Sequence, residues 1–182
     1  MQFPIVASDH FSDWITLNDT IMGGSSTASC IASEEGLILK GNVVEEDGGF
    51  ISCLSPIYLP SLDLSSYTGI TIFLDGGGRT FKLALRTELI KLFSFSPSFL
   101  QSVRWVAEVP TNESGSTRIN IPFDNFQATI RARKIFMPIN LQTKCINQFQ
   151  LLHSKFGKPG RLNDKFKAGS VKILLRSISG FH

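Results

Sequence analysis

The chain has 182 residues, a net charge of +3, 42% hydrophobic residues and 18% charged residues. This composition excludes a disordered chain, which has few apolar residues and a high net charge, and the length suits one domain over residues 1–182. No apolar run approaches the roughly 18 residues of a membrane-spanning helix, so the sequence predicts none.

The beginning of the sequence carries no targeting pattern. It lacks the basic and apolar regions of a signal peptide and the arginine-rich composition of a transit peptide, so we expect the protein to stay in the compartment where it is made. The cysteines are Cys30, Cys53 and Cys145, an odd number without a C-x-x-C pair. We therefore expect free, buried thiols in a reducing compartment.

Short strand-like segments follow one another along the chain, separated by glycine-rich turns. One helical turn is expected at residues 10–14. Strands are expected at residues 36–44, 49–54, 69–74, 81–87, 102–109, 117–123, 146–152 and 170–178. In the segment 81–87, Lys82, Ala84 and Arg86 face opposite to the apolar residues. The segment 146–152 is long enough to form a helix instead. Short, evenly spaced strands without a long amphipathic helix predict an all-β sandwich or barrel.

A basic segment lies near the end of the chain. Residues 150–182 contain seven Lys or Arg and one acid, a balance of +6, which leaves −3 for the rest. The basic loop, residues 154–169, carries Lys155, Lys158, Arg161, Lys165 and Lys167. Irregular segments of this length are usually functional or disordered. The charge favours an acidic partner, RNA or anionic lipid, and a merely solvated loop is the open alternative.

The sequence shows no pattern for catalysis, a cofactor or a metal. The turn "DGGGRT" matches neither G-x-G-x-x-G nor a P-loop, and no G-x-S-x-G elbow is present. His10, His153 and His182 are isolated from one another and from the cysteines. We therefore expect no enzyme, no cofactor and no metal site.

Aromatic residues leave two interpretations open. Phe93, Phe95 and Phe99 fit either a strand facing the core or a grip on a ligand. Trp14 and Trp105 pose the same choice, because buried tryptophans need a partner for the N–H and exposed ones are enriched at interfaces.

The stretch "WITLNDTIMGGSS", residues 14–26, has neither strand alternation nor helical spacing. Asn18 and Asp19 can fix a turn by bonding to nearby backbone N–H groups. The glycine pair allows a positive φ or a close approach of the backbone, and Trp14 and Met22 can anchor the loop. The stretch is either a structural clamp or a recognition loop, and the local chemistry favours the clamp.

Four motifs in order resemble those of the complex I intermediate-associated protein 30 family, from about residue 11 to 178. The first is "W-x-x-x-N-D-T-x-M-G-G-x-S". The others are "GGFIS", "GITIFLDGGGRTFKLALRT" and "INIPFDNFQATIRAR". Three positions depart from the family pattern: Gly77 replaces an Asp, Phe81 replaces a Tyr, and Ala132 replaces the Gly of R-G-R. The basic loop is longer than the usual family turn.

The resemblance implies a galactose-binding-like jelly roll of two antiparallel sheets with little helix. It implies a non-catalytic protein-binding module, an assembly factor or chaperone for a membrane-bound electron-transfer complex such as respiratory complex I or a photosystem. Its partners would be subunits of that complex, with peripheral contact to an anionic membrane and no nucleic acid. The protein would lie on the cytoplasmic, stromal or matrix side of a thylakoid or inner membrane. The alternatives are a permanent peripheral subunit and a carbohydrate-binding domain.

The expected contact residues come from the matched motifs, the tryptophans and the basic loop. They are Trp14, Asn18, Asp19, Met22, Arg79, Arg86, Trp105, Arg131, Arg133, Lys155, Lys158, Arg161, Lys165 and Lys167. For Asp19 an internal lock with one of the arginines is the other expected role.

Overall fold

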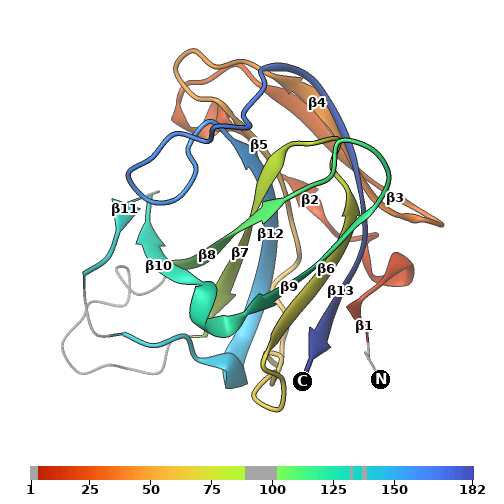
Figure 1. The fold of residues 1–182 in the computed structure, drawn as a ribbon, viewed down its shortest axis with the longest axis vertical. Coiled ribbons are helices and arrows are strands. Elements are labelled where there is room, and N and C mark those ends of the chain that lie inside the picture. Colours follow the sequence, from red (N-terminus) through yellow and green to blue (C-terminus); the bar gives the residue numbers. More distant parts are fainter. Residues whose placement is uncertain (1–3, 89–101, 132, 137–138) are drawn as a thin grey trace.

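The computed structural model describes residues 4–88, 102–131, 133–136 and 139–182. Within them the chain forms two antiparallel β-sheets that pack face to face (Figure 1). The predicted all-β sandwich is confirmed. The aromatic stretch that contains Phe93, Phe95 and Phe99 lies outside the described residues.

Sheet A has six strands in the order β3-β4-β13-β6-β9, and β1 also pairs with β13. They are β1 (Pro4–Val6), β3 (Thr27–Ser33), β4 (Gly36–Val43), β6 (Gly69–Asp75), β9 (Thr117–Pro122) and β13 (Gly169–Phe181). The long β13 pairs with both β4 and β6 and holds the middle of the sheet. β9 lies at an edge and ends at Pro122, which has no N–H for a further ladder bond.

Sheet B has seven strands in the order β11-β10-β8-β7-β12-β5-β2. They are β2 (Ile15–Thr16), β5 (Phe50–Leu54), β7 (Thr80–Thr87), β8 (Arg104–Pro110), β10 (Gln127–Ile130), β11 (Arg133–Lys134) and β12 (Ile146–Ser154). The segment 146–152 is therefore a strand and not a helix. It lies between β7 and β5, where both of its backbone edges are paired.

Several short 3₁₀ turns connect the strands of the described residues. These are η1 (Ser8–His10), η2 (Asp19–Met22), η3 (Phe123–Asn125) and η4 (Thr143–Cys145). The turn expected at residues 10–14 thus lies slightly earlier, because η1 ends at His10. None of the helices in this part of the chain has the length and apolarity to cross a membrane.

The core fills the space between the sheets with alternate residues of each strand. On β7, Phe81, Leu83 and Leu85 are fully buried. They join one apolar cluster with Trp105 of β8 and Phe149 of β12. Because strand residues alternate in direction, the residues between these core positions project from the other side of sheet B. We call that side the outer face of sheet B.

The expectation of free thiols is wrong for two of the three cysteines. Cys30 of β3 and Cys53 of β5 form a disulfide that joins sheet A to sheet B. The pairing brings together an edge strand of one sheet and a strand near the edge of the other. Cys145 is a free thiol, partly exposed and not buried as expected.

Candidate functional site

The carboxylate of Asp19 is fully buried and joins two segments of the chain. Within its own loop it accepts hydrogen bonds from the Ser26 N–H (3.0 Å) and the Ser26 hydroxyl (2.6 Å). From the turn before β5 it accepts the N–H groups of Gly49 (2.7 Å) and Phe50 (3.2 Å). Ser26 Oγ in turn accepts the N–H of Val44 at 2.9 Å. This set of bonds, the Asp19 network, fixes residues 18–26 against the β4–β5 turn.

Two glycines make room for this carboxylate. A Cβ at Gly24 or at Gly48 would overlap the side chain of Asp19. Gly23 ends η2 with a φ of 92°, a left-handed conformation that favours glycine. Gly24 of the glycine pair and Gly48 of the "GGF" turn therefore both leave space for the Asp19 carboxylate.

Hydrogen bonds keep Asp19 charged inside the protein. Burial alone would raise its pKa, but the donors from Ser26, Gly49 and Phe50 together hold the pKa below its ordinary value. The predicted internal role is correct, but the predicted partner is wrong. Backbone N–H groups and a serine hydroxyl bind the carboxylate, and no arginine in the described part of the chain does so.

The basic loop is folded and not merely solvated. Its first half is a small turn in which Phe156 and Leu162 form an antiparallel bridge. The Lys155 N–H donates to Gly49 O at 2.8 Å, and Lys155 Nζ donates to Glu45 O at 2.7 Å. These bonds attach the loop to the same β4–β5 turn that Asp19 holds. In Figure 1 the loop lies beside that turn at one end of the sandwich.

A buried histidine joins the second half of the loop to the core. The ring of His153, at the end of β12, lies between Phe81 (centroids 5.3 Å apart) and Phe166 of the loop (5.2 Å, stacked). His153 is fully buried. Burial first, and then the charge of Arg79, lower its pKa to about 4 despite backbone hydrogen bonds that act the other way. The ring is therefore neutral at physiological pH.

The outer face of sheet B carries cations and amides in rows across the strands. On β7, Lys82 and Arg86 project from this face, and Glu108 of β8 is paired with Lys82. Arg86 is paired with Gln148 of β12, and Arg104 of β8 is paired with Thr129 of β10. The further outward positions on the central strands are Ala84, Val106, Gln127 and Gln150.

The cations of this face are close together and partly removed from water. Burial first, and then the neighbouring charge of Arg86, lower the pKa of Arg104. Lys82 is only 7% exposed, and burial lowers its pKa to about 8 although Glu108 acts in the opposite direction. Among the described residues, no carboxylate oxygen lies within 4.0 Å of Lys82 Nζ or of the Arg86 guanidinium.

A small hollow of about 30 Å³ opens on this face between β7, β8, β10 and the basic loop. Lys82 and Glu108 line it with Asn125, Gln127 and Lys158. Glu108 also holds the loop, because its carboxylate accepts the Lys158 N–H at 2.9 Å and lies 3.8 Å from Lys158 Nζ. Glu108 thus binds Lys158 directly and acts on Lys82 only through its charge.

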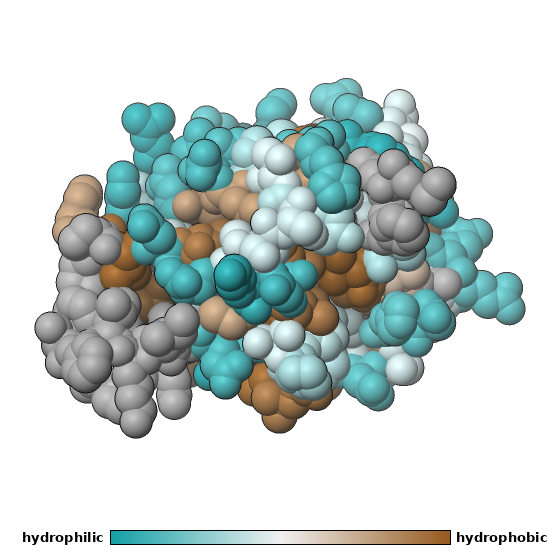
Figure 2. Space-filling view, turned by 90° about the horizontal axis from the view of Figure 1, so that it is seen from below, coloured by the Kyte–Doolittle hydropathy of each residue, from teal (hydrophilic) through white to brown (hydrophobic). Residues whose placement is uncertain are grey.

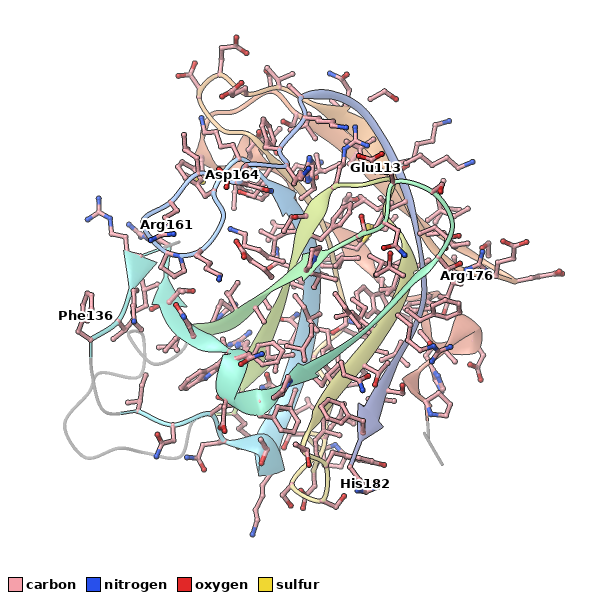
Figure 3. All side chains as sticks on the ribbon, viewed as in Figure 1. Glu113, Phe136, Arg161, Asp164, Arg176 and His182 are labelled. Carbon is pink, nitrogen blue, oxygen red and sulfur yellow. A yellow bond between two sulfur atoms is a disulfide. The ribbon has the colours of Figure 1, made fainter. Side chains whose placement is uncertain are left out.

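The edge of sheet B beyond β10 continues the positive surface. Arg131 has a φ of 47° in the turn between β10 and β11, and Arg133 begins β11. Both are exposed, as is Arg161 of the basic loop. In Figure 3 Arg161 and Phe136 project on the same side of the molecule, with Arg176 on the opposite side. Phe136 is 87% exposed, and Lys134 Nζ lies 5.5 Å from its ring centroid.

Several predicted contact residues are buried or occupied by the fold. Trp14 packs edge-on against Phe11 and is 4% exposed, and Trp105 faces the core with 6% exposed. With Asp19, these tryptophans are therefore not part of an exposed surface, contrary to the expected contact role. Arg79 is partly buried, and its guanidinium donates to Ser170 O at 3.0 Å, across to β13.

The remaining predicted residues lie at the surface in different places. Asn18 is half-buried as the N-cap of η2, and Met22 is 67% exposed beside Ile21. Lys165 and Lys167 are exposed on the basic loop. Figure 2 shows the lower end of the molecule as drawn in Figure 1, where apolar residues lie among polar ones.

Lys82, Arg104 and Glu108 were not predicted as site residues. Alternation along β7 did place Lys82 on the same side as Arg86, and that was the available signal. Arg104 gave no signal of this kind, because its approach to Arg86 depends on the pairing of β8 with β7. Among the described residues, no group of three or more His, Cys, Asp or Glu side chains is placed to hold a metal ion.

The described motifs agree with a known family. The model of the complex I intermediate-associated protein 30 family matches residues 3–174. The chain belongs to this family. The match includes both segments of the Asp19 network, the outer face of sheet B and the basic loop. No curated protein matches the chain.

Solved structures with the same fold are carbohydrate-binding modules and a larger enzyme. The family 11 module of the cellulase Lic26A-Cel5E of Clostridium thermocellum has a TM-score of 0.65 and 11% identity, over 100% of this chain and 95% of the module. The Clostridium thermocellum family 11 module in complex with a β-1,3-1,4-mixed-linked tetrasaccharide has a TM-score of 0.65 and 12% identity. That likeness covers 99% of this chain and 95% of the module. The agarase AgWH50C has a TM-score of 0.56 and 8% identity, over 100% of this chain but 25% of the agarase. At such identities the likeness shows the fold alone.

Proposed function

We propose that this family member is a non-catalytic protein-binding module that acts during assembly of a membrane-bound electron-transfer complex. The observation that carries the proposal is the family match over residues 3–174, because the family is described by its association with intermediates of complex I. The client would be an incomplete respiratory complex I or photosystem. The protein would work on the cytoplasmic, stromal or matrix side, peripheral to the membrane.

The surface chemistry supports a charged protein partner more than a neutral sugar. Pockets for small ligands are mostly apolar and aromatic, whereas the described outward positions of β7, β8 and β12 are charged, amide, hydroxyl or aliphatic. Trp105, one of the expected contact residues, faces the core. The carbohydrate-binding alternative therefore rests on the likeness of fold to the family 11 modules.

Capture of the client tests the proposal. The tagged full chain is expressed in its source organism, membranes are dissolved in mild detergent, and captured complexes are separated on a native gel before mass spectrometry. We expect the protein to migrate with an immature complex and to be absent from the mature one. Presence only in the mature complex would instead identify a permanent subunit.

A glycan array gives the second part of the test. Binding of a defined oligosaccharide, together with no captured complex, would contradict the proposal and favour the carbohydrate-binding alternative. Turnover of a substrate by the purified chain would contradict the non-catalytic role.

A further inference from the structure

The positive charges on the two outer faces of the sandwich are neutralised to different extents. On sheet A, Arg176 binds Asp75 at 2.8 Å and lies 3.8 Å from Glu35, and Arg118 covers the ring of Phe73 at 4.4 Å. On sheet B, Lys82 and Arg86 have no such carboxylate among the described residues. Lys40 and Lys172 on sheet A also have no ion pair among the described residues, but they are exposed, whereas Lys82 is buried beside the hollow. A cation that is not ion-paired attracts an anion from outside.

Because Lys82 is buried, an anion can approach its ammonium only at the hollow that the side chain lines. Its side chain is more than nine-tenths buried and lines the hollow beside Gln127 and Lys158. Among the described residues its ammonium has no hydrogen-bond acceptor, while Glu108 is already bound to the N–H of Lys158. Because Lys82 lines this open hollow, a guest carboxylate there would supply two acceptor oxygens for its ammonium.

We propose that the outer face of sheet B binds an extended acidic segment of the partner protein, with one carboxylate in the hollow at Lys82 and another at Arg86. The inference rests on the proposed function, because that function makes the occupant a protein. Its acidic character comes from charge complementarity with Lys82 and Arg86.

The spacing of the two cations fits an extended chain. Lys82 and Arg86 lie four residues apart on β7, which is about 13 Å at roughly 3.3 Å per residue. An extended peptide that lies along β7 repeats the same spacing, so acidic side chains at its positions i and i+4 reach both cations. A peptide with an acid at every second residue meets this requirement in each register that turns its acidic side chains toward β7.

The probe is a fluorescent ten-residue peptide of alternating Thr and Glu, with a Gln-for-Glu peptide as its neutral control. We expect the full chain to bind the acidic peptide, the neutral peptide to bind at least tenfold more weakly, and binding to weaken as salt rises. Lys82→Met together with Arg86→Gln should weaken binding of the acidic peptide at least tenfold. Glu108→Gln, which keeps an acceptor for the Lys158 N–H, should strengthen it.

The matched control removes two charges from the other face. Lys40 and Lys172 are paired neighbours on β4 and β13 and are exposed, so Lys40→Gln with Lys172→Gln should leave the affinity within twofold. If this control lost as much affinity for the acidic peptide as the sheet B variant, binding would depend on the total positive charge of the protein, and the proposal would be overturned. Should Lys82→Met fail to fold, Arg86→Gln alone must still weaken binding at least threefold.

Other anions are outcomes of the same assay. Tighter binding of a uronic-acid oligosaccharide, or of vesicles with anionic headgroups, with the same sensitivity to Lys82→Met and Arg86→Gln, would overturn a peptide as the occupant. No binding of the acidic peptide would also overturn it. If the doubly substituted chain captured the client complex as well as the natural chain, this inference would fail and the proposed function would stand. If the natural chain captured no complex, the proposed function itself would fail.

Discussion

The carboxylate of Asp19 joins two segments that are far apart in the sequence, because its hydrogen-bond donors come from Ser26 and from the turn at Gly49 and Phe50. The conformation of the loop at residues 18–26 therefore depends on a single buried charge. The exposed side chains of Ile21 and Met22 are displayed by that loop. Asp19 thus acts on any contact through the loop it positions and not by touching a partner.

Asp19→Asn tests this role. The substitution removes the charge and places an amide N–H₂ among N–H donors. Hydrogen bonds to a buried charge are worth about 1.5–3 kcal/mol each, and some of the bonds to the side-chain oxygens are weakened together. We therefore expect the free energy of unfolding to fall by about 2–4 kcal/mol. Urea denaturation measures it. The exposed Asp13→Asn is the matched control and should change stability by less than about 0.5 kcal/mol. Equal stability of the two variants would contradict the account.

His153 makes the stability of the folded protein depend on pH. Its pKa is about 4 when folded and near 6.5 otherwise, so the unfolded chain binds the proton first as the pH falls. The stability contributed by the neutral ring is fully present above pH 6.5 and is lost progressively between pH 6.5 and 4. The total loss is about 3.5 kcal/mol, from about 1.4 kcal/mol per pKa unit.

Denaturant titrations at several pH values measure that loss. His153→Gln cannot take up the proton, so its free energy of unfolding should be flatter between pH 6.5 and 4 than that of the natural chain. Exposed carboxylates contribute to both proteins alike. His10→Gln, at an exposed position, should keep the natural slope. The same slope in His153→Gln and the natural chain would show that His153 is not the group responsible.

At the scale of elements, the basic loop combines structural and free cations. Lys155 and Lys158 are bound to Glu45 O and to Glu108. Arg161, Lys165 and Lys167 are exposed, and no ion pair involves them among the described residues. The two groups should therefore respond differently to substitution.

Charge reversal separates the two groups. Arg161→Glu, Lys165→Glu and Lys167→Glu together should weaken attachment to the client or to anionic membranes several-fold at low salt, with little effect at high salt and none on the unfolding temperature. Lys158→Glu should lower the unfolding temperature instead, because it places like charges at Glu108. Cosedimentation and thermal unfolding measure the two effects. Attachment that is unchanged in the triple variant would exclude the exposed cations from the contact.

The disulfide between β3 and β5 should stabilise the sandwich. Cys30 and Cys53 are 23 residues apart, and closing a loop of that length restricts the unfolded chain by about 3 kcal/mol in the chain-entropy account. We expect Cys30→Ser with Cys53→Ser, or reduction, to lower the free energy of unfolding by about that amount. Cys145→Ser should have a much smaller effect. Alkylation of all three thiols in the folded protein without reductant would contradict the disulfide.

Elements with a clear apolar pattern were predictable, and those without one were not. β7 alternates and β6 is a continuous apolar run, so both were predicted with nearly their observed bounds. β3, "TASCIAS", was missed because small residues at a sheet edge show no contrast between faces. β11 has two residues and exists only through its pairing with β10.

At the scale of the whole molecule, the packing of two sheets decides what each surface displays. The sequence indicated Arg86, Arg131 and Arg133 through the matched motifs. It could not indicate the approach of Arg104 to Arg86, because that depends on how two strands pair. The Cys30–Cys53 bond likewise depends on two strands in different sheets. The backbone donors to Asp19 leave no trace in the sequence except the glycines that admit the carboxylate.

The opposite surfaces of the sandwich are expected to have different roles. On the outer face of sheet A, Arg176 is ion-paired, and Lys40 and Lys172 are exposed to water. On that of sheet B, Lys82 is buried at the hollow, and neither Lys82 nor Arg86 has a carboxylate within 4.0 Å in the described part of the chain. A partner that binds by charge should therefore dock on sheet B. Val106 lies in the middle of that face, and Lys40 lies on the outer face of sheet A.

Site-specific photo-crosslinking within the captured complex tests this claim most directly. A photoreactive amino acid is placed at position 106 in one chain and at position 40 in another, and the crosslinked peptides are identified by mass spectrometry. We predict crosslinks from position 106 to an acidic segment of one client subunit and none from position 40. Crosslinks from position 40 alone would contradict the account.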